Sequence, residues 1–100
     1  MSIAFAAMLL LQSPMVNSMA ADEGFRSCVK MATDDALLRD VKPDAFRSHL
    51  ERICGPARNQ WMKARDEADG EDADPEGTFY AAKSRFDAAI ADYAKRYAGK

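Results

Sequence analysis

The fold is decided by residues 28–54, which read CVKMATDDALLRDVKPDAFRSHLERIC. A cysteine stands at each end of this stretch, and each lies 13 residues from Val41, near the turn between two predicted helices. Residues equidistant from the turn of an antiparallel helical hairpin lie side by side, so Cys28 and Cys54 can come within the distance that a disulfide requires. The sequence therefore predicts a helical hairpin joined by one disulfide.

Apolar residues recur at spacings of three and four on both sides of this turn, and strand patterns are nearly absent. We expect a first helix over residues 22–40. A second helix is expected to open at Pro43, because proline suits the first turn of a helix. The pair Gly55-Pro56 interrupts the apolar stripe of this second helix without changing its phase. The second helix is therefore either kinked or split there.

A third helix is expected from Asp74 to Gly99, where Asp74 can cap the first turn and Pro75 stands at the first helical position. Lys95 and Arg96 complement the dipole at its carboxyl end. With the hairpin, this helix predicts an all-α three-helix bundle.

Residues 1–20 have the order of an export signal. Ile3 to Leu11 is an unbroken apolar run, and small residues stand at Ser18 and Ala20. No Lys or Arg precedes the run, which departs from the usual pattern. The run is also shorter than the roughly 20 residues that a membrane-spanning helix needs. We expect residues 1–20 to be a cleaved signal peptide, residues 21–100 to form a single domain, and the product to be periplasmic or secreted.

All charged side chains lie after the predicted cleavage site. The 14 basic and 16 acidic residues give the mature domain a net charge of 14 − 16 = −2. Nucleic acid binding draws its affinity from clustered Lys and Arg, so this balance gives no reason to expect it. We also expect no stable membrane insertion after signal cleavage.

Catalytic and metal-binding patterns are missing from the sequence. The two cysteines are separated by 25 residues, unlike the close Cys-x-x-Cys pair of oxidoreductases or haem sites. His49 is the only histidine, and no metal-binding residue type stands three or four positions from it. We therefore expect a structural disulfide, a histidine on the flank of its helix, no cofactor or metal, and no enzyme activity.

The segment Asp66 to Gly77 contains seven acidic residues and no basic one. Asp72, Asp74 and Glu76 resemble the start of a calcium-binding EF-hand loop, but Lys83 occupies the twelfth position, where a bidentate Glu belongs. We expect a solvated acidic turn between the second and third helices, with weak divalent-cation binding as an alternative.

Aromatic residues supply most of the expected core, in the second and third helices above all. If some of them stay in water, they mark a surface for a partner or for a second copy of the chain. The candidates for this surface are Trp61, Tyr80, Tyr93 and Tyr97.

The layout of a signal followed by one Cys in each of two helices resembles small exported bacterial proteins, in architecture only. It is more loosely similar to two-cysteine periplasmic acid-stress chaperones, whose cysteines lie farther apart. We expect a non-enzymatic binding or structural accessory protein of the cell envelope, whose partner is a protein or another envelope component. The alternative is an acid-responsive chaperone that loosens at low pH and exposes the aromatic residues Phe25, Phe46, Trp61, Phe79 and Phe86.

Overall fold

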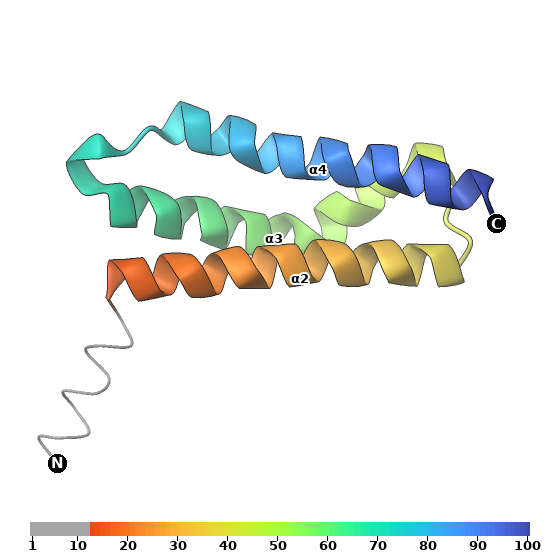
Figure 1. Cartoon of the computed structure of the whole chain (residues 1–100), viewed down its shortest axis with the longest axis horizontal. Helices are drawn as coiled ribbons and strands as arrows, with labels where there is room; N and C mark the ends of the chain where they lie inside the picture. The colour runs from red at the N-terminus through yellow and green to blue at the C-terminus, as the bar shows by residue number, and fades with distance from the viewer. Residues whose placement is uncertain (1–12) are drawn as a thin grey trace, which may run out of the picture.

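The computed structural model describes residues 13–100, which form three long helices (Figure 1). These are α2 (Pro14–Leu38), α3 (Pro43–Asp69) and α4 (Pro75–Ala98), and a short 3-10 helix, η1 (Gly70–Asp72), joins the last two. The described residues contain no strand. The predicted all-α three-helix bundle is confirmed. The apolar run of the predicted signal peptide lies outside the described residues.

Each long helix begins at a proline. The fixed φ of proline suits the first turn, and its lack of an N–H costs no hydrogen bond there, because the first N–H groups of a helix have no acceptor within the helix. In α4, the Asp74 carboxylate accepts a hydrogen bond of 3.0 Å from the backbone N–H of Gly77, as the sequence predicts. The prediction for α2 is wrong at its start, because this helix begins at Pro14 rather than near residue 22. The hydroxyl of Ser13 caps it by accepting a bond of 3.3 Å from the N–H of Val16.

Helix α3 continues through Pro56, so the second helix is not split. Proline has no N–H to donate to the carbonyl of Arg52 four residues earlier, and its ring pushes that carbonyl aside. The first half of α3 is accordingly tilted relative to the second (Figure 1). Because of this bend, α3 stays in contact with both α2 and α4.

The disulfide joins α2 to α3 at the middle of the hairpin. The Cα atoms of Cys28 and Cys54 are 5.8 Å apart, and Cys54 is fully buried. The pairing predicted from the equal distances to Val41 is confirmed.

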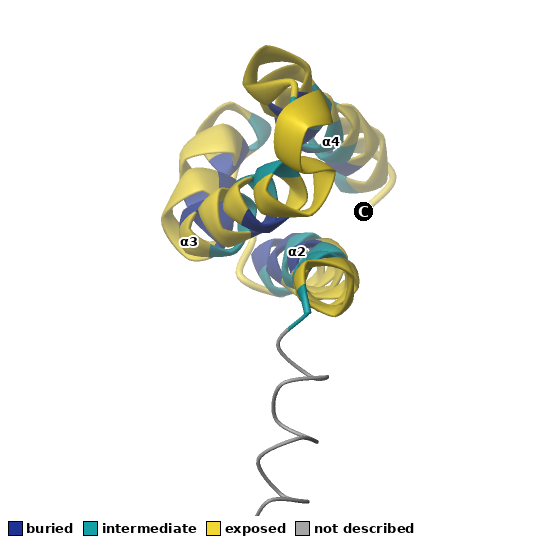
Figure 2. Cartoon of the chain, turned by 90° about the vertical axis from the view of Figure 1, so that its left-hand side faces the viewer, coloured by how far each residue is buried: buried dark blue, intermediate teal, exposed yellow. Residues whose placement is uncertain are grey.

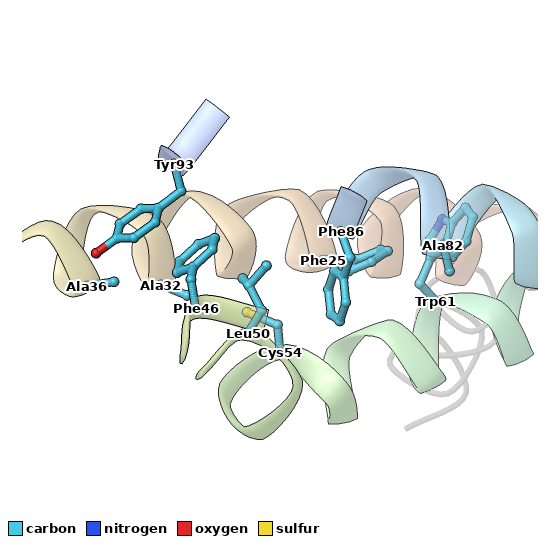
Figure 3. Packing of buried hydrophobic residues seen from close by; sticks show 10 residues of the cluster. All are labelled: Phe25, Ala32, Ala36, Phe46, Leu50, Cys54, Trp61, Ala82, Phe86 and Tyr93. Atoms are coloured by element: carbon cyan, nitrogen blue, oxygen red, sulfur yellow. The ribbon is translucent and has the colours of Figure 1, made fainter. Parts of the chain in front are cut away.

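The core runs along the axis of the bundle in two aromatic groups (Figure 3). In one, Phe25 contacts Trp61 and Phe86, with ring centroids 5.5 and 5.7 Å apart. In the other, Phe46 stacks on Tyr93 at 3.9 Å. Figure 3 shows Leu50 and Cys54 between the two groups. Aromatic pairs of this kind contribute about 1 kcal/mol each beyond the area that they bury.

The helices do not pack equally on one another. Seen end-on, α2, α3 and α4 form a triangle with their buried faces turned inward (Figure 2). Helix α2 packs along α3, whereas its contact with α4 is much smaller. The seam between α2 and α4 is therefore the most open side of the bundle.

Candidate functional site

The four aromatic residues predicted as a partner surface do not lie on one surface. Trp61 and Tyr93 belong to the core, Tyr97 is half-buried, and Tyr80 is exposed. Tyr93 is buried with its polar end satisfied, because its hydroxyl donates a hydrogen bond of 2.6 Å to the carbonyl of Val41. Trp61 lies beneath the guanidinium of Arg85, 4.4 Å from the ring centroid. Both residues are thus unavailable to a partner.

Phe79, which the sequence pattern places in the core, is instead 55% exposed. Its neighbour Thr78 faces inward, where the Thr78 hydroxyl donates a bond of 2.9 Å to the carboxylate of Asp66. The next residue in a helix is turned by about 100°, which carries Phe79 outward. There it contacts Tyr80 edge-on beside the acidic turn. Phe79 also lines a small pocket of about 170 Å³, together with Ala82 and Phe86.

A groove of about 420 Å³ lies between α2 and α4. Its floor is formed by Val29 and Thr33 of α2 and by Ala88 and Ala89 of α4. The Thr33 hydroxyl is occupied by a hydrogen bond of 2.7 Å to the carbonyl of Val29. The floor therefore offers a partner mainly methyl groups.

Charged side chains form the two edges of this groove. Helix α2 contributes two cations and helix α4 two cations and one carboxylate, which are Arg26, Lys30, Arg85, Arg96 and Asp92. Because these residues come from helices far apart in the sequence, no local sequence motif predicts that they line one groove. We call this surface, with its floor, the α2–α4 groove.

At one end of the α2–α4 groove, Asp22 accepts hydrogen bonds from Arg26, at 2.8 Å, and from Arg85. Burial alone would raise the pKa of Asp22, but the hydrogen bonds from the two arginines outweigh it, and the pKa lies below its ordinary value. The carboxylate thus holds Arg85 over Trp61. The Nη1 atom of Arg85 is buried and forms no hydrogen bond with a described residue, and the guanidinium lies over the rings of both Trp61 and Phe25.

At the other end, Arg96 contacts the carboxylates of Asp34, at 3.2 Å, and Asp92, at 3.8 Å. Lys30, between the two ends, forms no ion pair with any residue that the structure describes. Four cations therefore stand against the three carboxylates of Asp22, Asp34 and Asp92, a local balance of 4 − 3 = +1. The groove is positive in a chain whose net charge is −2.

The sequence predicts His49 on the flank of its helix, but the side chain is buried, and the residue is only 8% exposed. Its Nε2 atom is 3.8 Å from a carboxylate oxygen of Asp35 and forms no hydrogen bond within residues 13–100. His49 stacks on Phe46, with ring centroids 6.3 Å apart. Its Nδ1 atom lies 3.4 Å from a guanidinium nitrogen of Arg52.

The described residues form neither a metal site nor a site of free thiols. No three His, Cys, Asp or Glu side chains of residues 13–100 lie together in a way that could hold a metal ion, and this applies to the acidic turn. Both cysteines are in the disulfide. None of the described helices is long and apolar enough to span a bilayer.

Comparison with known proteins gives no match. No protein-family model, curated protein or solved structure is significantly similar to the chain. The α2–α4 groove is therefore interpreted from its own geometry and charge.

Proposed function

We propose that the chain is a small exported protein that binds another macromolecule of the cell envelope through the α2–α4 groove and catalyses no reaction. The single observation that carries this proposal is the groove itself. It has an apolar floor and charged edges, and it lies along the least packed seam of the bundle.

The composition of the groove favours binding over catalysis. Three of its four cations are arginines, which stay protonated at physiological pH and cannot exchange protons with a substrate. A positioned nucleophile or general base next to them would be needed for an enzyme. An apolar floor with charged edges is instead the arrangement of a protein-protein contact, in which apolar burial stabilises the complex and charges select the partner.

Export is supported by how the core is distributed along the chain. Residues 14–20 of α2 contribute no buried side chain, whereas Ala21 is half-buried and Phe25 is fully buried. Cleavage before Ala21 would thus leave the core and the Asp22–Arg85 contact in place. A disulfide in so small a domain is also typical of oxidising compartments.

The test is site-specific photo-crosslinking in the native cell envelope. A photoreactive residue replaces Ala88, which lies exposed in the floor of the groove. The matched control carries it at Met31, which is 70% exposed on α2 but does not line the groove. We expect one discrete cross-linked product from position 88 and none from position 31. Equal products from both positions, or none from position 88, would remove the groove as a docking surface.

A further inference from the structure

We infer that the occupant of the α2–α4 groove is an acidic amphipathic helix of a partner protein, with an apolar stripe that faces the floor and carboxylates on both sides of the stripe. This inference rests on the proposed function and adds the chemistry of the partner. It follows from the spacing of the cations, from the size of the floor residues and from the state of the ion pairs.

The cations are spread along the groove rather than gathered at one point. Arg85 and Arg96 are 11 residues apart on α4, which corresponds to about 16 Å along a helix axis. Arg26 and Lys30 stand one turn apart on the opposite edge. A ligand that meets all of them is elongated and carries negative charges on both sides, over about three helical turns. A single-headed anionic amphiphile has one charged end and would leave most of these cations unused.

The floor accepts a helix because its residues are small. Ala88 and Ala89 extend no further than a methyl group, so the backbone of an added helix can come close to α4. Leu or Ile side chains of that helix would fill the space above Val29. The bundle then gains a fourth helix along its most open seam, which is a common arrangement for helices of this length.

The existing ion pairs leave room for new carboxylates. The side chain of Arg26 is 68% exposed and that of Arg96 is 45% exposed, and ion pairs at this exposure contribute little stability, so both guanidinium groups can also meet carboxylates of a partner. Lys30 has no ion-pair partner among the described residues and is the first contact that we assign to the incoming helix. Nucleic acid fits less well, because the floor offers methyl groups and none of the residues that line the groove is an aromatic residue on which a base could stack.

The test uses a fluorescent synthetic peptide about 18 residues long, with Leu on one face and Glu on both flanks, enough to span the groove with a turn to spare. The control peptide has the same apolar face and Lys in place of Glu. Binding is measured by anisotropy with the oxidised protein, residues 21–100, and with the full chain. Two charge-reversal variants are compared. Lys30→Glu changes a lysine of the groove. Lys63→Glu changes an exposed lysine of α3 that lies outside the groove and, like Lys30, forms no ion pair with a described residue.

We expect the acidic peptide to bind, the basic peptide not to bind, Lys30→Glu to weaken binding about fivefold or more, and Lys63→Glu to change it less than twofold. Circular dichroism establishes that both variants are folded. Equal binding of both peptides, or equal effects of the two variants, would overturn the inference. Lys30-dependent binding to anionic vesicles without peptide binding would overturn it in favour of lipid. If position 88 cross-links in cells but the acidic peptide does not bind, this inference fails and the proposed function stands.

Discussion

Removing the disulfide is expected to cost the domain a large part of its stability. The perturbation is the double substitution Cys28→Ala and Cys54→Ala. The two cysteines are 26 positions apart, and closing a loop of that length lowers the entropy of the unfolded chain enough to stabilise the fold by about 3.5 kcal/mol. Domains of this size have a total stability of only about 5–10 kcal/mol. The mature domain should therefore stay folded without the bond, but with a small margin.

The assay is urea unfolding at pH 7, followed by circular dichroism and by the fluorescence of Trp61, which the core encloses. The free energy of unfolding should fall by about 3–4 kcal/mol, and the melting temperature by roughly 15–25 °C. Wild-type protein under a reducing agent should agree with the double variant, because Ala replaces the buried Cys54 with only a small loss of volume. A loss below about 1 kcal/mol in both samples would show that the unfolded chain is already held in a hairpin, and would refute the entropy argument.

Three further changes test other parts of the structure. Tyr93→Phe should lower the free energy of unfolding by about 1 kcal/mol, because a buried hydrogen bond is lost. Burial raises the pKa of Tyr93, so the wild type keeps the stabilisation from this hydrogen bond below about pH 10 and loses it as the pH rises further. The variant has no hydroxyl at this position and should not show that loss. Urea midpoints at pH 7 and 11 measure both effects. Asp22→Asn should flatten the acid limb of a plot of melting temperature against pH. Burial opposes ionisation of Asp22, but the hydrogen bond from Arg85 and a second arginine outweigh it and lower the pKa, so the ionised group stabilises the fold above about pH 4 and the contribution disappears below; identical acid limbs would contradict this. Pro56→Ala should raise the free energy of unfolding by about 1–3 kcal/mol, because the new N–H can bond to the carbonyl of Arg52, and a lower urea midpoint would mean that packing depends on the bend.

The architecture could be predicted because its determinants are local. Pro43 and Asp74 mark helix starts through backbone geometry and capping, and the two cysteines mark a hairpin by their equal distance from Val41. The sequence alone does not reveal the start of α2, because the Ser13-Pro14 pair, which caps the helix, also fits the end of a signal peptide.

Burial of individual aromatic residues could not be read from periodicity alone. Phe79 and Thr78 are neighbours, and a rotation of α4 by one residue decides which of them enters the core. The observed rotation places Thr78 against Asp66 of α3, a contact that the sequence of α4 alone does not reveal. The α2–α4 groove cannot be predicted from the sequence for the same reason. Its two edges come together only when two helices that are distant in the sequence adopt one particular relative rotation.

The most direct test of the account is the intact mass of the protein isolated from its native cells, with and without reduction and thiol alkylation. We expect a chain that begins at Ala21 and whose two thiols are alkylated only after reduction. A chain that retains residues 1–20 and whose cysteines are alkylated without reduction would contradict both export and the disulfide on which the proposed function depends.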